Sequence, residues 1–511
     1  MAVVALDPAP APRSSPPLLG AVFAGVLLIY LALLPPGMFQ PDANSMADVA
    51  ASLVTSLDFS IPCQATAVPG RGGACFSPWY PLLSVVSAPV VGLGLGIGAL
   101  LDLPPTYLAK VLALSVSAAA GAGAAAFCAA IALELGASRR GAVAAATALA
   151  LGTEMLAYSR TFYAEALCAL LVTAGVWLLT QNGRRRVAGL ASLGLAVLAK
   201  PTMVAVGPAV GAARALAERR IRPLVVACAA TAAGGLLYLG YNWLRFADPL
   251  DFGGPRPGQG EASDRELSSG DFGVLDVFEG AGILLVSPGR GLLWFSPVVL
   301  LGAFALWRRR RDPLAASCLG AAAGLVLLHA GFPGSGFEWG TRYLVAVLPL
   351  LCAGLALLRG RLVKVAVVLA VLGLVVQAPV IVAFPERWLA EAEASGLSNG
   401  DVYWALPSKR IVESWPAAGR QLRAAARSDP RELVAAAGRP GDRAIVPVED
   451  QQLLRVVSLW WWMLPVVGIP AWAGALSAGG AMAAGGWILW RTAGGAERRS
   501  GRRRARLISG G

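Results

Sequence analysis

The chain has 511 residues, of which 56% are hydrophobic and only 14% charged, and its formal net charge is +13. This composition excludes an ordinary soluble protein built from several domains with charged surfaces. Most of the arginines stand in short clusters between long apolar runs, which is typical of cytoplasmic loops and excludes a nucleic-acid-binding protein.

Long apolar runs predict an all-α polytopic membrane protein, because about 18 or more apolar residues suffice for a membrane-spanning helix. The N-terminal tail, residues 1–17, precedes a run without a small-residue cleavage site, so we expect a span there and not a cleaved signal. With that tail in the cytoplasm, every arginine cluster is cytoplasmic if there are twelve transmembrane helices, at 18–36, 107–135, 141–157, 164–181, 187–199, 201–218, 223–243, 292–307, 313–331, 342–358, 363–384 and 460–490. The sequence therefore predicts a multi-pass protein of the cell (inner or plasma) membrane with both termini in the cytoplasm.

The apolar run at residues 80–101 is left out of these spans. A crossing there would place Arg139 and Arg140 outside and would invert every later loop, so this glycine- and proline-rich run is predicted to be interfacial or re-entrant. The predicted parts are a core at 18–384 with outer loops at 37–106 and 244–291, an extracytoplasmic segment at 385–459, the last span at 460–490, and a basic cytoplasmic tail at 491–511.

The first outer loop begins with an acid and an amphipathic segment. Met46, Val49 and their neighbours follow helical spacing, which predicts a juxtamembrane helix along the membrane surface. Two interpretations of Asp42, which stands just before it, stay open. Either Asp42 and Ser45 cap the helix, with Ser45 and Asp48 forming a capping box, or Asp42 is a general base that faces a cavity in the membrane.

The cysteines and the histidine limit the kinds of site that the chain can form. Cys63 and Cys75 lie in the first outer loop, where an oxidising compartment would allow a disulfide between them. The remaining five cysteines lie in apolar runs and are expected to behave as small buried hydrophobes. Since His329 is the only histidine, we expect neither a histidine-based metal site nor a Ser-His-Asp triad.

Several polar motifs follow the first loop in a set order and spacing. They lie at Phe76 to Leu83, Tyr107 to Lys110, Gly136 to Gly141, Tyr158 to Glu165, Ala199 to Pro201, Tyr241 to Phe246, Ser287 to Pro297 and Glu338 to Leu344. In this order they resemble the membrane glycosyltransferases with the GT-C fold. The likeness is to bacterial relatives of the dolichyl-phosphate-mannose protein mannosyltransferases and of the aminoarabinose transferase, and it covers residues 18–360.

That resemblance implies an inverting glycosyltransferase that moves a sugar from a polyprenyl-phosphate carrier to an envelope glycan, lipid or protein at the extracytoplasmic face. It puts Asp42 and Glu165 in the place of catalytic acids. It puts substrate-binding side chains at Tyr80, Lys110, Lys200, Glu338 and Arg342. Cations at the outer interface would stabilise the leaving lipid phosphate, and a carboxylate would take the proton of the acceptor hydroxyl.

Simpler roles stay open for several of these side chains. Lys110 and Arg342 stand at helix ends, where a basic side chain also reaches the lipid headgroups. A functional role is favoured for Lys200, because this residue interrupts an otherwise apolar hairpin. Glu165 follows Arg160 closely and could compensate charge at the start of a helix. Glu338 could pair with Arg342, four residues on, and His329 is expected to be a buried side chain and not a ligand.

No cofactor is required by this interpretation. Some members of the family bind a divalent cation through carboxylates and histidines, and this sequence lacks the histidines. A divalent cation therefore remains an open alternative, and no metal ligand is assigned.

Two other classes of function compete. A transporter or lipid-linked sugar flippase would show internal repeats and a polar path through the bundle, and an assembly protein of the envelope would show scattered acids and a closed groove. Clustering of Asp42, Glu165 and Lys200 at the outer interface would favour the enzyme.

Overall fold

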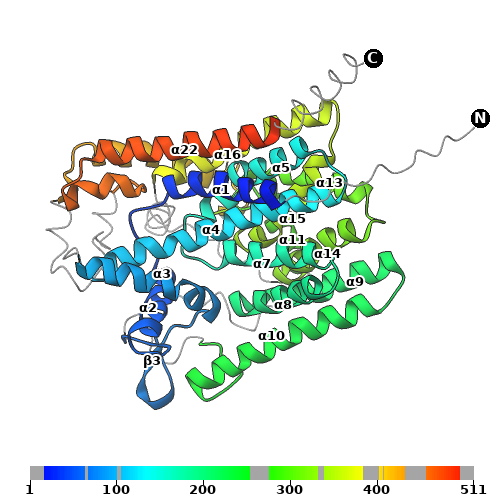
Figure 1. The fold of residues 1–511 in the computed structure, drawn as a ribbon, viewed down its shortest axis with the longest axis horizontal. Coiled ribbons are helices and arrows are strands. Elements are labelled where there is room, and N and C mark those ends of the chain that lie inside the picture. Colours follow the sequence, from blue (N-terminus) through cyan, green and yellow to red (C-terminus); the bar gives the residue numbers. More distant parts are fainter. Residues whose placement is uncertain are drawn as a thin grey trace, which may run out of the picture.

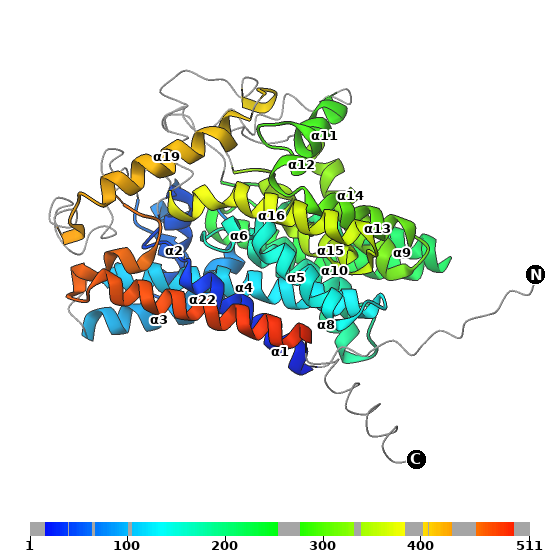
Figure 2. The same cartoon turned by 90° about the horizontal axis from the view of Figure 1, so that it is seen from above.

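The computed structural model describes residues 16–38, 40–63, 67–100, 105–253, 276–331, 339–383, 402–406, 408–431 and 456–494. This part of the chain is mainly helical, as the sequence predicts. Most of the long helices lie side by side in one bundle, while α2 and the strand β3 lie together at one end of it (Figure 1, Figure 2).

The helices lie close to the predicted spans. The long ones are α1 (Pro16–Ala32), α3 (Pro81–Leu100), α4 (Pro105–Glu134), α5 (Arg139–Gly152), α7 (Glu165–Leu178), α8 (Arg184–Ala199), α9 (Val206–Glu218), α10 (Arg222–Phe246), α13 (Val298–Arg308), α14 (Pro313–Ala330), α16 (Arg361–Val382) and α22 (Ala471–Gly494). Between and beside them lie α2 (Pro41–Thr55), α6 (Met155–Tyr158), α11 (Asp276–Val286), α12 (Leu292–Phe295), α15 (Leu348–Ala353) and α19 (Lys409–Ala425). Short 3-10 helices are η1 (Arg71–Gly73), η2 (Pro201–Ala205), η4 (Arg342–Val347), η5 (Gly354–Leu357) and η6 (Trp460–Val467).

Five described helices are long and apolar enough to cross a membrane by length and composition, namely α3, α4 from Leu108 onward, α10, α14 and α16. Their burial differs with their place in the bundle. In the most apolar window of α4, 89% of the residues are buried, against 22% in α16 and 28% in α10. Exposed valine and leucine side chains such as Val367, Val371 and Leu372 cover the free face of α16. A buried central helix surrounded by helices with apolar outer faces is what a lipid environment requires.

Loops gather at the two ends of the bundle. One end, called the arginine-rich end below, carries the loops at 135–138, 179–183, 219–221, 309–312 and 358–360. Arg309 joins two of these loops, because its Nη1 donates to the carbonyl oxygen of Leu135 at 2.6 Å. Helices α7 and α8 run between this end and the opposite end, where Glu165 begins α7 and Lys200 follows α8.

The run at 80–101, predicted to be interfacial or re-entrant, forms one unbroken helix, α3. It packs beside the first half of α4, so closely that a Cβ on Gly94 would lie 2.5 Å from the Cα of Ala109. The two helices form a hairpin next to α2 (Figure 1). Helix α4 continues past this hairpin to Glu134 without α3 beside it.

The last helix starts later than the predicted span at 460–490. The residues Trp460 to Val467 form the 3-10 helix η6, and Gly468 ends it with a φ of +81°. Helix α22 begins only at Ala471 and packs antiparallel on α1. A Cβ on Gly485 would lie 2.5 Å from the carbonyl oxygen of Gly25, so the absence of side chains at this crossing lets the two backbones approach.

The first loop carries a small sheet. Strands β1 (Ser60–Ile61), β3 (Cys75–Phe76) and β2 (Val68–Pro69) pair antiparallel in the order β1-β3-β2. The disulfide that the sequence allows between Cys63 and Cys75 is formed. It closes a loop that two short strands alone would hold weakly.

Candidate functional site

A carboxylate and two cations meet at the end of the bundle opposite the arginine-rich end. The Nζ of Lys200 lies 2.8 Å from Oε1 of Glu165, and the Nε of Arg342 lies 2.7 Å from the same oxygen. The three residues come from the start of α7, the end of α8 and the start of η4. The structure thus brings together three of the residues that the sequence predicts for the site.

Local sequence explains how Lys200 reaches this position. A residue before proline is driven out of the helical region, and Lys200, which precedes Pro201, has an extended backbone with φ −161° and ψ 120°. Helix α8 ends there and the chain turns into η2. The lysine side chain is therefore held at the helix end and is only 6% exposed.

Tyr343 lies among further basic side chains. The Nζ of Lys200 stands 4.4 Å from the centroid of its ring, and the guanidinium carbon of Arg290 stands 5.3 Å from it. His329 stacks on the same ring with centroids 4.3 Å apart. Glu165, Lys200, Arg290, Arg342 and Tyr343 are called the Glu165 cluster below.

The two oxygens of Glu165 differ. Oε1 accepts hydrogen bonds from both Lys200 and Arg342, whereas Oε2 is buried and accepts no hydrogen bond from any described residue. The carboxylate is only 3% exposed. A buried acceptor without a donor is costly, so this oxygen is suited to receive a hydroxyl or amine donor from a bound molecule.

A second buried acid, Glu154, supports the cluster. It is fully buried, and its Oε2 accepts from the Ser296 hydroxyl at 2.9 Å. Its Oε1 accepts the backbone N–H of Thr341, the residue before Arg342. Gly340 has a φ of +61°, and a Cβ there would lie 2.1 Å from Oε1 of Glu154. The acid thus fixes the turn that positions Arg342.

Glu154 is a site residue that was not predicted, although the sequence holds a signal for it. Glu154 lies inside the predicted span at 141–157, and an ionisable residue within an apolar run is expected to be functional or to fix structure. Arg290, which is fully buried, was also missed, because it lies within a motif of turn residues. Three cations, Lys200, Arg290 and Arg342, thus accompany two carboxylates, Glu154 and Glu165, which leaves a net positive charge.

Arg160 does not pair with Glu165, although Glu165 does lie in the first turn of α7, where a carboxylate compensates the helix dipole. Its guanidinium donates to backbone carbonyl oxygens of Leu33, Val380 (2.6 Å), Ile381 (3.0 Å) and Ser458 (2.6 Å). Arg160 therefore ties the end of α1, the end of α16 and the segment before η6 together, and leaves Glu165 to Lys200 and Arg342.

Asp42 lies in the first turn of α2, and the predicted capping box is not formed. The helix begins at Pro41 with Gln40 as its N-cap. Ser45 is therefore inside the helix, where its hydroxyl lies 3.0 Å both from the carbonyl oxygen of Asp42 and from the Ser77 hydroxyl. Asp48 forms an ion pair with Lys110 instead of capping.

Tyr80 links the region of Asp42 to the Glu165 cluster. Three residues after Ser77, it packs against Trp79 and Tyr238, with ring centroids 6.0 and 6.3 Å away. It is close enough to Glu165, Arg342 and Tyr343 to interact with them electrostatically. The loop from Ser77 to Tyr80 thus runs from α2 toward the cluster.

Lys110 bonds to residues of α2 and not to those of the Glu165 cluster. Its Nζ donates to Oδ1 of Asn44 at 2.9 Å and lies 3.3 Å from Oδ1 of Asp48. Asn44 and Asp48 lie about 200° and 240° around α2 from Asp42, on the other side of the helix. Lys110 therefore joins α4 to the other side of α2, next to a hollow lined by Ala51, Val91 and Leu95.

Arg245 holds the first loop against the end of α10. It donates to the carbonyl oxygen of Ser77 and to Oδ1 of Asn242, the latter at 2.7 Å. Its guanidinium carbon lies 4.0 Å from the centroid of the Tyr241 ring. A fully buried arginine of this kind fixes the loop that leads to Tyr80.

Glu338 lies outside the described residues, and so does its suggested pairing with Arg342. No group of three or more His, Cys, Asp or Glu side chains suited to a metal ion occurs in the described ranges.

The chain was compared with known proteins. No protein-family model and no curated protein matches it. Its fold is similar to ArnT from Cupriavidus metallidurans in the apo state, with a TM-score of 0.47 and 16% identity over 93% of this chain and 77% of that chain. The same protein bound to undecaprenyl phosphate gives 0.44 and 17% over the same shares. The oligosaccharyltransferase AglB from Archaeoglobus fulgidus, in complex with an inhibitory peptide and a dolichol-phosphate, gives 0.41 and 13% over 78% of this chain and 54% of that chain.

These neighbours are membrane glycosyltransferases with the GT-C fold, the class that the sequence motifs resemble. Because the TM-scores lie below 0.5, the assignment of the site rests on this chain's own residues. What those residues provide is a buried, net positive cluster at the end of a helical bundle with apolar outer faces, in which one carboxylate oxygen accepts no hydrogen bond from the described part of the chain.

Proposed function

We propose that this chain is a membrane glycosyltransferase that moves a sugar from a polyprenyl-phosphate carrier to an envelope acceptor. The observation that carries this proposal is the Glu165 cluster, in which Lys200 and Arg342 bind one carboxylate oxygen of Glu165 at 2.8 and 2.7 Å. The resemblance of residues 18–360 to the GT-C enzymes supplies the donor class.

The charges of the cluster suit a departing phosphate. In the proposed reaction, an acceptor hydroxyl oxygen attacks the anomeric carbon while the bond from that carbon to the phosphate oxygen breaks. The polyprenyl phosphate leaves with the electron pair, and Lys200 and Arg342 stabilise its charge because they act inside a largely buried site. Attack opposite to the leaving phosphate inverts the anomeric carbon.

The proton of the acceptor hydroxyl goes to a carboxylate. We assign this role to Asp42, which is partly exposed in the first turn of α2. A carboxylate within hydrogen-bond reach of the attacking hydroxyl contributes roughly 10²–10⁴-fold to such a step. Oε2 of Glu165 is suited to orient a hydroxyl of the donor sugar. Tyr80 is assigned to the substrate-binding surface between the two acids.

We further propose that the cluster faces the extracytoplasmic side and that the chain crosses the membrane twelve times. Two observations support this orientation. The disulfide between Cys63 and Cys75 lies in the first loop, and disulfides persist in oxidising compartments. The arginine loops gather at the opposite end, as they do on the cytoplasmic side of membrane proteins. Helix α2 is then a juxtamembrane helix and α3 accompanies α4 without crossing.

The test is a transfer assay with purified full-length protein in lipid nanodiscs. A panel of radiolabelled polyprenyl-phosphate sugars is incubated with the protein and with a lipid and glycan extract as acceptor. Wild type is expected to move label from at least one carrier, and Asp42→Asn is expected to lower the rate by about 10²-fold or more. Asp58→Asn is the matched control, because Asp58 is an exposed acid of the same loop whose hydrogen bonds within the described residues go to its neighbours Phe59 and Ser60.

Two results would refute the assignments. Undiminished transfer by Asp42→Asn would remove Asp42 as the base. If labelled carrier crossed the bilayer of proteoliposomes without transfer of its sugar, the chain would be a flippase and the transferase assignment would be wrong.

A further inference from the structure

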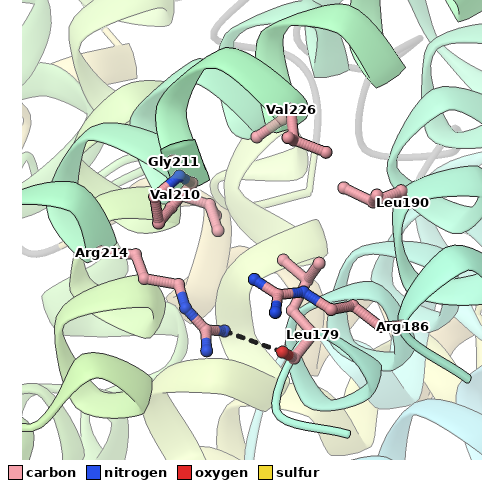
Figure 3. A pocket seen from close by; sticks show the side chains of 9 residues that line it. Leu179, Arg186, Leu190, Val210, Gly211, Arg214 and Val226 are labelled. Carbon is pink, nitrogen blue, oxygen red and sulfur yellow. Dashed lines mark hydrogen bonds between the residues drawn. The ribbon is translucent and has the colours of Figure 1, made fainter. Parts of the chain in front are cut away.

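A hollow lies at the arginine-rich end, between α8, α9, α10 and the residues after α7 (Figure 3). Its empty space, which includes the part open to solvent, is about 280 Å³, and the apolar part of its lining includes Leu179, Leu190, Val210 and Val226. Two arginines, Arg186 and Arg214, also line it. Helix α7 has 14 residues, so about 20 Å of helix separates this hollow from Glu165. It is therefore not part of the Glu165 cluster.

The two arginines are held differently. Arg214 is fixed by an ion pair with Glu218 and by a hydrogen bond from Nη1 to the carbonyl oxygen of Leu179 at 3.0 Å. The Arg186 guanidinium points into the hollow (Figure 3) and makes no hydrogen bond or ion pair with any other residue that the structure describes. It is thus available to an anion, and Arg214 adds a second guanidinium beside it.

The surroundings of the hollow are strongly basic. Glu218 is the one acid in the sequence of residues 179–227. Seven arginines belong to the loops and helix ends around the hollow, namely Arg184, Arg185, Arg186, Arg214, Arg219, Arg220 and Arg222. This excess of positive charge attracts anions toward the hollow, and the attraction extends over about 8–10 Å at physiological ionic strength.

Exposed apolar side chains stand next to these arginines. Val187, Leu216, Ile221 and Val225 are between 58% and 81% exposed. A soluble anion would gain nothing from such a rim, whereas the acyl chains of a lipid would cover it. Helix α10 lies at the edge of the bundle (Figure 1), so lipid can reach the hollow from the side.

We propose that this hollow binds the headgroup of an anionic phospholipid from the leaflet at the arginine-rich end. Its phosphate accepts hydrogen bonds from the guanidinium of Arg186 and from the free side of Arg214, and its acyl chains pack on the rim at Val187 and Val225. Basic hollows between membrane helices are known to hold anionic headgroups, and the planar guanidinium matches phosphate geometry. The inference does not depend on the proposed transferase activity.

The experiment measures lipid binding to the full-length protein in detergent by native mass spectrometry. Phosphatidylglycerol and phosphatidylcholine with the same acyl chains are added in turn, and inorganic phosphate is added alone as a third arm. Wild type is expected to retain phosphatidylglycerol in preference to phosphatidylcholine. Arg186→Gln is expected to weaken phosphatidylglycerol binding by about tenfold.

Arg361→Gln is the matched control, since Arg361 is an exposed arginine at the same end, at the start of α16 and away from the hollow. It is expected to leave the affinity within a factor of about two. Arg186→Lys keeps the charge and loses the planar fork, so its affinity should fall between wild type and Arg186→Gln, which guards against a mere folding defect.

Three outcomes would overturn the proposal. An equal loss of phosphatidylglycerol affinity in Arg186→Gln and Arg361→Gln would mean that diffuse surface charge holds the lipid. Equal retention of both phospholipids by wild type would mean that no headgroup is recognised. If inorganic phosphate at millimolar concentration displaced phosphatidylglycerol from wild type, the ligand would be a soluble anion.

Discussion

Glu165 is the residue whose surroundings limit the chemistry most. One oxygen of its carboxylate accepts hydrogen bonds from two cations, and the other oxygen is buried without a donor among the described residues. Burial of such a group is tolerated because the two cations compensate its charge. The carboxylate can therefore position Lys200 and Arg342 and still offer one acceptor to a substrate.

Replacing Glu165 by glutamine tests this double role. Glu165→Gln keeps the size of the side chain and removes the charge, so Lys200 and Arg342 would face each other uncompensated. We expect a loss of stability of roughly 3–5 kcal/mol and a fall in transfer of at least about 10²-fold. Thermal unfolding and the transfer assay measure the two effects. Glu218→Gln, at the arginine-rich end, should change neither strongly, and equal effects of both substitutions would contradict the assigned role.

Gly340 permits a separate test of the turn before Arg342. In Gly340→Ala the new Cβ would lie 2.1 Å from Oε1 of Glu154, in addition to a backbone with φ +61°. Gly360→Ala is a matched control, because Gly360 has φ +59° and no atom within 4 Å of its Cβ position. We expect the control to cost about 1–3 kcal/mol of folding free energy because of its positive φ, and Gly340→Ala to cost more and to reduce transfer. Equal melting temperatures of the two variants would show that Glu154 does not constrain this turn.

At the scale of helices, the sequence predicts the position of those helices that a long apolar run defines. The boundaries of α4, α7, α10 and α16 follow from runs of apolar residues that arginines or prolines interrupt. The start of α22 was missed because Trp460 to Val467 is as apolar as a span, and only Gly468 separates it from the helix that follows.

Much of the site could not be predicted in the same way. Motif order suggested Glu165, Lys200 and Arg342 separately, but their contact joins residues 35 and 177 positions apart in the chain. No periodicity within a single helix contains that information. The same holds for Lys110, since only the rotation of α2 decides whether its partner is Asp42 or the pair Asn44 and Asp48.

Arg160 shows how one side chain can connect several elements. It reaches carbonyl oxygens at the ends of α1 and α16 and in the segment before η6. Hydrogen bonds from a charged donor contribute roughly 1.5–3 kcal/mol each, so Arg160→Lys, which cannot span these acceptors, should lower the melting temperature clearly. Arg310→Lys, on an exposed loop, is the control for the exchange itself. A melting temperature of Arg160→Lys equal to wild type would mean that these contacts add nothing.

At the scale of the whole molecule, the two ends of the bundle have opposite characters. One carries the disulfide loop, α2 and the Glu165 cluster, and the other carries the arginine loops and the hollow near Arg186. This division favours a fixed orientation in the bilayer.

Labelling of single introduced cysteines tests the orientation. Leu406→Cys lies in the segment expected outside and Arg310→Cys in a loop expected inside; both positions are exposed. An impermeant maleimide added to intact cells should label only Leu406→Cys, and added to inside-out vesicles only Arg310→Cys. The native free cysteines are buried or half-buried, and unmodified protein serves as the background. The reverse pattern would place the Glu165 cluster in the cytoplasm and would rule out the proposed reaction there.

Helix α1 packs directly on α22, with Gly25 against Gly485. Because α22 is synthesised more than 400 positions after α1, this contact forms only once α22 has emerged. Until then the flank of α1 that α22 covers must be shielded by lipid or by an insertion chaperone. Without α22, this flank of α1 would remain uncovered by protein, so truncation before α22 should leave α1 with an exposed packing surface.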